Sequence, residues 1–289
     1  MPNTTVDMII PVRNGEATID RAVESALCQP GLTVRVIVVD DGSTDHTREV
    51  LDRIAERGNV TRFQTGGVGA AQARNIGLDH AHAEFVSFCD ADDWWNDGQL
   101  RAITQTMIRC DASVGVAGYE NVRSGSRRGH RFWHEAHMNG AQFADACLLD
   151  SRVQGFLWNK VYRRDAIGMR RVPTDYRVCE DLLFNLRLGH EMPQMKVVCV
   201  PTVAYEYDLR GQSITRGNND LTAGVLKALE NARGLVSEDV LAGARYRFAV
   251  GNGFNGGISA QERRCFFSGP APLGEKVRVG GRALLTHRF

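Results

Sequence analysis

Two aspartates separated by one residue, Asp90 and Asp92, form the strongest chemical feature of the sequence. They follow the apolar run 84–89, which predicts a buried strand. At the end of a strand, two such carboxylates can point toward one cation, and their oxygens suit Mg²⁺ or Mn²⁺ and the phosphates that these ions bind. The alternative is a simple turn over residues 90–93, in which Asp93 caps the following helix.

Two further polar clusters also follow apolar runs. Residues 11–14 (PVRN) end the run 6–11, and residues 40–43 (DDGS) follow the run 34–39. Strands that alternate with helices indicate a mostly parallel sheet covered on both faces. Ligands of such sheets bind at the carboxyl ends of the strands. We therefore expect the three polar clusters to converge on one edge of the sheet.

The remaining patterns complete an α/β fold. Apolar spacing predicts helices over 17–27, 47–54, 70–81, 98–109, 180–190 and 221–236. Two more apolar runs predict strands over 113–117 and 196–200, and the polar stretch 123–131 predicts a loop or the tip of a hairpin.

Composition excludes several classes of protein. A chain of 289 residues that is 43% hydrophobic can bury a large core and is not disordered. Its net charge of +1 provides no overall attraction for nucleic acid. No stretch approaches the roughly 18 apolar residues that span a bilayer, and the start lacks the features of a signal peptide. Seven scattered cysteines suit buried free thiols in a reducing compartment, so we expect a cytoplasmic protein.

Charge is distributed unevenly along the chain. Residues 1–95 hold 8 basic and 15 acidic side chains, whereas residues 221–289 hold 10 basic and 5 acidic ones. From Arg245 onward, the basic residues are interleaved with Phe and Leu. This mixture predicts peripheral contact with the inner face of a cell membrane. A helical cap with solvated arginines and a contact between subunits of an oligomer are the alternatives.

Four motifs occur in a specific order: IIPVRNGEATI at 9–19, VVDDGSTD at 38–45, ARNIGL at 73–78 and FCDADDW at 88–94. Together they resemble the nucleotide-binding half of glycosyltransferase family 2, whose members have the GT-A fold. WNKVY at 158–162 and the pair Glu180-Asp181 resemble acceptor-side motifs of the same family.

The resemblance covers roughly residues 5–215 and implies a division of the chain. A GT-A catalytic domain would occupy 1–219, with a nucleotide-binding half over 1–95 and an acceptor-side half over 96–219. A basic, mostly helical C-terminal extension would occupy 220–289, which resembles no family that we can name.

The resemblance also implies an activity. It is the inverting transfer of a sugar from a nucleotide-diphosphate donor, a UDP-sugar, to a hydroxyl of a glycan or lipid-linked acceptor, assisted by Mn²⁺ or Mg²⁺. One alternative is a sugar nucleotidyltransferase of similar fold, but residues 11–15 match its Gly-rich loop poorly. Another is a non-catalytic nucleotide-sugar or glycan-binding protein, against which the intact acidic pairs argue.

On the donor side, the resemblance assigns roles residue by residue. It places Pro11, Val12, Arg13, Glu16 and Asp41 around the nucleotide base. It places Arg74 at the diphosphate, Asp90 at the ribose or the metal ion, and Asp92 at the metal ion. Arg13 stands where many members carry an aromatic ring. Its planar guanidinium can stack on a base, but this departure weakens the assignment of that base as uracil. Asp41 is also a natural turn residue.

On the acceptor side, the resemblance makes Asp181, with Glu180 beside it, the general base that inversion requires. The positive end of the helix dipole is expected to keep this carboxylate ionised. Three neighbours, Trp158, Asn159 and Lys160, would bind the acceptor, although Trp158 is also a natural core residue. A segment with Arg210 and Ser213 would fold over the diphosphate, with an ordinary surface loop as the alternative.

One tempting motif does not meet its pattern. In His134-Glu135-Ala136-His137 the histidines lie three residues apart, whereas H-E-x-x-H requires four. We therefore interpret these residues as surface or core side chains rather than a metal site.

Overall fold

A computed structural model describes residues 4–124, 126–209, 219–251 and 259–286. Within these ranges the strands are β1 (Thr5–Val12), β2 (Thr33–Asp40), β3 (Val60–Gln64), β4 (Phe85–Phe88), β5 (Trp94–Trp95), β6 (Val114–Arg123), β7 (Ser126–His130), β8 (Ala136–Asn139), β9 (Lys160–Arg163) and β10 (Lys196–Asp208).

The helices are α1 (Ile19–Leu27), α2 (Thr47–Ala55), α3 (Ala70–Asp79), α4 (Gln99–Cys110), α5 (Gly140–Leu149), α6 (Arg164–Ile167), α7 (Glu180–Glu191), α8 (Asn219–Asn231), α9 (Glu238–Gly251), α10 (Ala260–Ser268) and α11 (Leu273–Thr286). Each predicted helix and strand corresponds to one of these elements, with ends shifted by a few residues, and β6 and β10 run well beyond their predicted ends.

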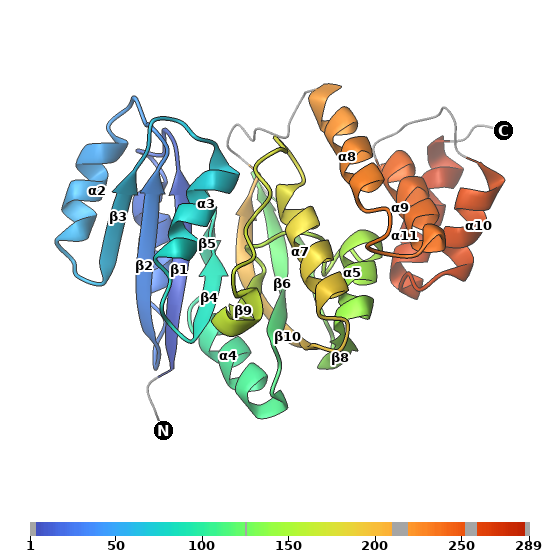
Figure 1. The fold of residues 1–289 in the computed structure, drawn as a ribbon, viewed down its shortest axis with the longest axis horizontal. Coiled ribbons are helices and arrows are strands. Elements are labelled where there is room, and N and C mark those ends of the chain that lie inside the picture. Colours follow the sequence, from blue (N-terminus) through green and yellow to red (C-terminus); the bar gives the residue numbers. More distant parts are fainter. Residues whose placement is uncertain (1–3, 125, 210–218, 252–258, 287–289) are drawn as a thin grey trace.

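All described strands belong to one sheet, in the order β3-β2-β1-β4-β9-β6-β10-β5, with β7 on β6 and β8 on β10 (Figure 1). Strands β3, β2, β1 and β4 pair in parallel, and β6 pairs in parallel with β10. β9 is antiparallel to both β4 and β6, so the two parallel sets run in the same direction. Their carboxyl ends therefore lie along one edge, which confirms the mostly parallel α/β architecture.

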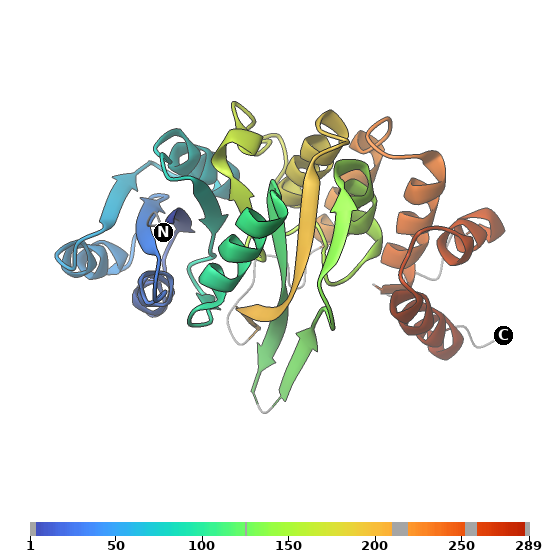
Figure 2. The ribbon, with the colours of Figure 1, turned by 90° about the horizontal axis from the view of Figure 1, so that it is seen from below.

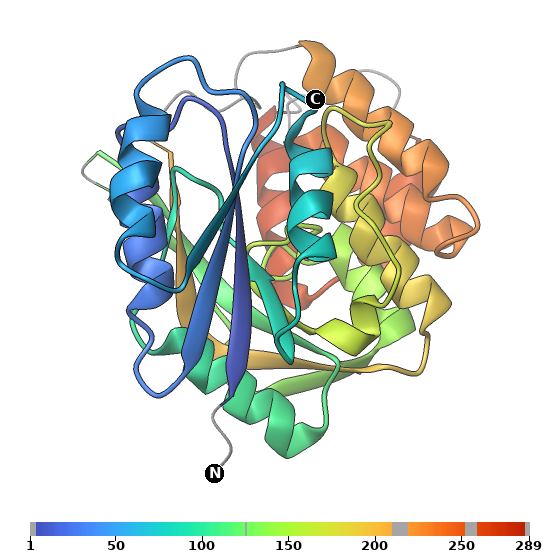
Figure 3. The same ribbon diagram turned by 60° about the vertical axis from the view of Figure 1, so that its left-hand side comes forward.

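Helices cover both faces of the sheet (Figures 2 and 3). On β1, Met8 and Ile10 belong to the buried cluster that includes α1, α2 and α4 on one face of the sheet, whereas Ile9 belongs to the cluster that includes α3, α5 and α7 on the other. This alternation follows from the two-residue period of a strand. Gly77 allows α3 to approach closely, since a Cβ atom there would lie 2.4 Å from the side chain of Ile9.

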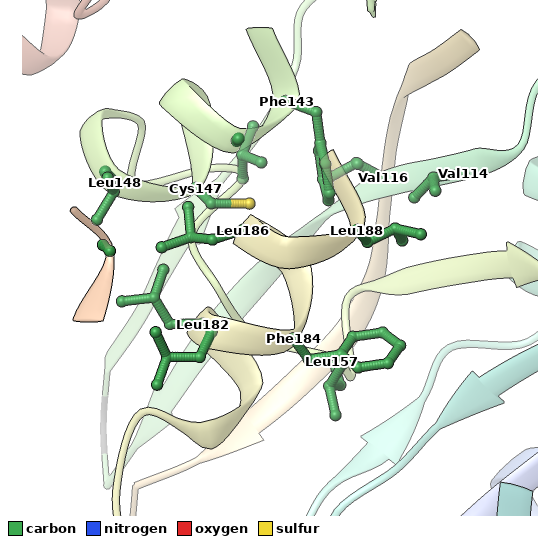
Figure 4. Packing of buried hydrophobic residues seen from close by; sticks show 14 of the residues in the cluster. Val114, Val116, Phe143, Cys147, Leu148, Leu157, Leu182, Phe184, Leu186 and Leu188 are labelled. Atoms are coloured by element: carbon green, nitrogen blue, oxygen red, sulfur yellow. The ribbon is translucent and has the colours of Figure 1, made fainter. Parts of the chain in front are cut away.

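The C-terminal helices pack on the α/β domain and continue its core. Helix α9 packs on α5, and α8 packs on α7 (Figure 1). Buried residues of the extension, among them Val225, Leu241 and Phe266, join the cluster that holds Phe143 and Leu182. Figure 4 shows that cluster around α5 and α7. The mostly helical extension predicted from the sequence is confirmed, and it is not a detached tail.

The expected burial of the cysteines needs correction. The seven cysteines are free, as predicted, but Cys28 is exposed and Cys110, Cys179 and Cys265 are only half-buried. Within the described ranges, no helix has both the length and the apolar character needed to cross a lipid bilayer.

Candidate active site

The loops that follow β1 and β2 hold each other through reciprocal hydrogen bonds. The backbone N–H of Asn14 donates to Ser43 Oγ at 2.9 Å, and the N–H of Thr44 donates to Asn14 Oδ1 at 2.8 Å. Glu16 accepts a 2.8 Å hydrogen bond from the N–H of His46, the residue before α2. The exposed Glu16 carboxylate is thus used to cap a helix, and the two polar clusters are brought together as expected.

Asp41 organises the glycine-rich loop that leads into α3. Its carboxylate accepts hydrogen bonds from Thr65 Oγ1 at 2.5 Å, Val68 N at 2.6 Å and Gly69 N at 2.8 Å. Desolvation opposes its ionisation, but these three donors and nearby Arg13 together lower its pKa. Gly69 begins the loop-to-helix transition at φ +92°, a backbone conformation that favours glycine. The buried Asp41 carboxylate thus holds the glycine-rich loop in place, and its role beside the base stays a prediction.

The residues assigned to the rim of the base lie at the end of β1 and just beyond it. Val12 is buried, Pro11 is half-buried and Arg13 is exposed, with its guanidinium near Gly67. The exposed Arg13 is the one of these three whose side chain is free to reach a ligand from the loop above the sheet edge.

The turn after β4 is held by Tyr205 of β10. The Tyr205 hydroxyl accepts from the N–H of Asp90 at 3.0 Å and donates to Asp93 Oδ2 at 2.8 Å. Asp93 also accepts from the N–H of Asp208 at 2.7 Å. The expectation that Asp93 caps the next helix is wrong, because α4 begins at Gln99 after Gly98 and the buried Asp93 instead ties the turn to β10.

Asp92 carries negative charge that its surroundings do not balance. Its own backbone N–H is the hydrogen-bond donor that favours the ionised carboxylate. Desolvation and the neighbouring Asp90 raise its pKa, and Asp208 adds to the repulsion while Arg21 opposes it. Arg21 donates to the backbone oxygen of Asp92 at 2.6 Å rather than to the carboxylate. A half-buried set of oxygen ligands with surplus negative charge fits Mg²⁺ or Mn²⁺.

Arg74 joins the two acidic motifs of the chain. From α3, its buried guanidinium donates to Asp90 Oδ1 at 2.8 Å and to Glu180 Oε1 at 2.9 Å. Although desolvation opposes it, attraction to these carboxylates raises the pKa of Arg74. Within the described part of the chain, the buried Arg74 Nε atom has no hydrogen-bond partner. Arg74 therefore positions the carboxylates, and no sequence motif indicated that contact.

Asp181 lies next to this bridge, in the first turn of α7. Its Oδ1 accepts from the N–H of Leu182 at 2.8 Å. Desolvation and then repulsion by Glu180 raise its pKa to about 7, against the attraction of Arg74. Burial and the adjacent carboxylate thus oppose the ionisation that the helix dipole is expected to favour. A pKa near neutrality suits a group that takes up a proton.

The expected acceptor-binding residues lie deeper than predicted. Asn159 and Lys160 are fully buried, and Lys160 Nζ donates to the backbone oxygens of residues 153, 154 and 156 at 2.6–2.9 Å. Burial lowers the pKa of Lys160 to about 8. Trp158 is buried between the rings of Phe156 and Tyr205. In this structure these buried side chains support the loop over 150–158 from inside the protein and do not extend into solvent.

Two of the predicted residues, Arg210 and Ser213, lie outside the described residues. Three contributors escaped the sequence analysis: Arg21, Asn75 and Tyr205. Asn75 exchanges two 2.8 Å hydrogen bonds with the backbone of Val172 and so fixes α3 against the segment that leads to α7. In the sequence, only its position directly after Arg74 could have indicated that Asn75 contributes to the site.

With this geometry in place, the comparisons with known proteins identify the class and then the family. The fold resembles the crystal structure of S. aureus TarS in complex with UDP-GlcNAc, with a TM-score of 0.72, 21% identity, and coverage of 96% of this chain and 81% of that one. That likeness shows a GT-A fold. A model described as "Glycosyl transferase family 2" matches residues 7–168, more than half of the chain. The chain belongs to glycosyl transferase family 2.

Two curated bacterial relatives bear the names "Putative glycosyltransferase EpsH" and "UDP-Glc:alpha-D-GlcNAc-diphosphoundecaprenol beta-1,3-glucosyltransferase WfgD". EpsH of Bacillus subtilis (strain 168) is 27% identical over 224 residues, which cover 75% of this chain and 64% of EpsH. WfgD of Escherichia coli is 30% identical over 126 residues, 44% of this chain and 50% of WfgD. The match thus spans less than two thirds of the length of either relative.

Proposed function

We propose that this chain is an inverting glycosyltransferase that moves a sugar from a UDP-sugar to a hydroxyl group of a glycan or lipid-linked acceptor. The observation that carries the proposal is the Arg74 bridge, which brings Asp90 of the donor side and Glu180 of the acceptor side onto one guanidinium. Family membership supports the transfer of sugars, and the UDP-GlcNAc bound to TarS and the UDP-Glc named for WfgD support the donor class.

In this mechanism Asp181 accepts the proton of the acceptor hydroxyl as that oxygen attacks the anomeric carbon from the side opposite the leaving group. A pKa raised to about 7 makes Asp181 a stronger base than an exposed aspartate while leaving much of it ionised at neutral pH. Glu180 and Asp90, held by Arg74, fix the position of this base relative to the donor. The proton stays on Asp181, and the nucleoside diphosphate departs as the leaving group.

Charge balance supports assistance by a metal ion. Asp90, Asp92 and Asp93 lie together, and Arg74, the cation that reaches Asp90, is shared with Glu180. A diphosphate would be repelled by this edge unless a cation accompanied it. Asp92, with Asp90, would hold Mn²⁺ or Mg²⁺, which supplies neutralisation of the charge on the leaving diphosphate. Arg13 stacks on the base from the rim of the site.

The test is calorimetric titration of UDP, GDP, CDP and dTDP, each with and without Mn²⁺, followed by assay of the matching nucleotide sugar. We expect UDP to bind in a metal-dependent way and its sugars to be consumed when an acceptor is present. Tight metal-dependent binding of GDP instead would overturn the choice of base alone. Binding of nucleotide without any product would favour the non-catalytic alternative, and a nucleotide sugar formed as product would favour the nucleotidyltransferase.

For the acceptor, we propose a lipid-linked glycan reached through contact of the extension with an anionic membrane. Leu273 and Val277 lie one turn apart on α11 with 78% and 67% of their surface exposed, and Arg282 is exposed on the same helix. Exposed apolar residues beside cations are typical of helices that rest on anionic lipid. Flotation with anionic vesicles should carry the protein, and the double variant Leu273→Asp, Val277→Asp should stay behind. Equal recovery of both proteins would exclude this surface.

A further inference from the structure

Three different metal-binding side chains meet at the edge of the sheet opposite the candidate active site. Cys110 ends α4, Glu135 directly precedes β8, and His137 lies within β8. Helix α4 ends before β6 begins, and β8 pairs with the start of β10, so the cluster lies at the amino ends of the parallel strands (Figure 1). The cluster takes part in none of the contacts at the candidate active site.

The donor atoms lie close enough together to bind one tetrahedral metal ion. Cys110 Sγ lies 3.6 Å from Glu135 Oε1, and His137 Nε2 lies 3.1 Å from the same oxygen. All three ligand atoms fall within 4.8 Å of one another. Metal bonds of about 2.0 Å to oxygen or nitrogen and about 2.3 Å to sulfur place tetrahedral ligands roughly 3.3–3.5 Å apart. The two separations that involve Glu135 lie within a few tenths of an ångström of these values, and the third, from Cys110 to His137, is at most 4.8 Å.

The surroundings hold the carboxylate in a suitable orientation. Arg109 donates to Glu135 Oε2 at 2.5 Å and reaches Oε1 only at 3.4 Å. Glu135 Oε1 therefore faces the thiol and the imidazole, while Oε2 is occupied by the guanidinium. β8 pairs with β10, with His137 opposite Val198, and this pairing fixes the backbone of the imidazole ligand. Such outer contacts orient ligands in known metal sites.

We propose that Cys110, Glu135 and His137 bind one Zn²⁺ ion, with water as the fourth ligand. A thiolate, an imidazole and a carboxylate together favour zinc over Mg²⁺ or Mn²⁺, which prefer all-oxygen sets such as the one at Asp92. The Cys110 thiol releases its proton to solvent as the metal binds. The ion joins the end of α4 to the start of β8. This site is distinct from the metal-assisted chemistry proposed above and does not depend on it.

The test is titration of the full-length protein with Zn²⁺ in competition with a chromogenic chelator, and with Co²⁺ as a spectroscopic probe. We expect one ion per chain and a thiolate-to-cobalt charge-transfer band. Cys110→Ser should abolish that band, and Cys110→Ser and His137→Ala should each weaken Zn²⁺ binding about 100-fold, since loss of a direct ligand costs at least as much as loss of an outer contact.

Matched controls separate this site from other thiols, histidines and carboxylates. Cys28→Ser removes the exposed cysteine far from the cluster, and His134→Ala removes a neighbouring exposed histidine that is not part of it. Both should bind Zn²⁺ like the parent, and so should Asp92→Ala. His137 is exposed, so its replacement should leave the fold intact, which far-ultraviolet circular dichroism checks. Absence of a stoichiometric Zn²⁺ site, or binding that survives Cys110→Ser and His137→Ala, would overturn the proposal.

Discussion

Two regions of the molecule, the candidate active site and the C-terminal extension, each contain a buried arginine that forms ion pairs. The balance of charge around the two arginines differs. At the candidate active site, one Arg74 is shared by Asp90 and Glu180, with Asp92 and Asp181 close by. In the extension, one Glu275 is shared by Arg247 and Arg278. Carboxylates are therefore in excess in the first region, and cations are in excess in the second.

The difference shows in the proton affinities of the two regions. Desolvation and like charges raise the pKa values of Asp92 and Asp181. Desolvation also acts on Glu275, but hydrogen bonds and attraction from its two arginines lower its pKa to about 2. A carboxylate such as Glu275, which is fully paired with cations, stabilises a contact but is not available to take up a proton near neutral pH. The surplus of carboxylates at the sheet edge instead leaves groups ready to take up a proton or a cation.

The largest expected effect follows from neutralising the base. Asp181→Asn should lower the rate of sugar transfer by about 10²–10⁴-fold, the usual contribution of a general base. Binding of nucleotide in the presence of Mn²⁺ should change little. Initial rates and calorimetry on the same samples make the measurement. Asp175→Asn, at an exposed position six residues earlier, is the matched control and should behave like the parent. Full activity of Asp181→Asn would remove the base assignment.

Arg74→Ala should be the more destabilising of the two arginine variants. It leaves two carboxylates, Asp90 and Glu180, without this cation, and breaking a buried pair costs about 3–5 kcal/mol of unfolding free energy. Arg247→Ala should cost less, because Glu275 keeps its ion pair with Arg278. Arg247 also loses its 2.9 Å hydrogen bond to the backbone oxygen of Leu148. Transfer activity per folded molecule should fall only in Arg74→Ala. Urea denaturation and active-site-normalised rates test this, with the exposed Arg264→Ala as control. Equal activity losses would erase the contrast between the regions.

Removing the uncompensated carboxylate should weaken ligand binding without weakening the fold. We expect Asp92→Asn to lower the metal-dependent affinity for UDP by about 10-fold or more, a loss of roughly 1.4 kcal/mol. The raised pKa of Asp92 means that its ionised form opposes folding near neutral pH. The variant should therefore melt at the same or a higher temperature at pH 8. Calorimetry measures both the UDP affinity and the melting temperature, and the exposed Asp97→Asn is the control. A lower melting temperature of Asp92→Asn would show that Asp92 has a purely structural role.

Lowering the pH should affect the two regions in different windows. Because the base must be ionised, the transfer rate should fall by up to tenfold per pH unit below about 7, where Asp181 takes up a proton. Glu275 has a depressed pKa, so its stabilising effect is complete above the unfolded value of about 4.5 and is lost as the pH falls toward about 2. Rate profiles and hydrogen exchange of α9 and α11 measure the two windows. Coinciding transitions would contradict the separation.

Much of the first half of the fold could be predicted because its patterns are local. β1, β2 and β4 are continuous apolar runs, and α1 and α2 have clear amphipathic spacing. β3 was missed because none of its residues is fully buried, so its sequence has no apolar run. α5 was missed because its small and apolar residues give only a weak contrast between its two faces. The Asn139–Gln142 capping box was the available signal for its start.

The candidate site was predictable only in its parts. The acidic motifs were recognisable from their own residues, and strand order brought the first three clusters to one edge. The depth of Lys160, the contact from Arg74 to Glu180 and the pKa of Asp181 depend on neighbours far along the chain. Arg74 and Glu180 are separated by 106 positions, and no periodicity reaches that far.

The same separation has a consequence for the order of folding. Contacts between distant positions form late, since the loop between them must first be closed. The strands β1 to β4 and their helices can associate while α7 is still unplaced, and during synthesis residue 74 emerges well before residue 180. Arg74 and Asn75 then receive Glu180 and Val172 last. The proposed donor side of the site would thus be in place before the proposed base, Asp181, is brought to it by α7.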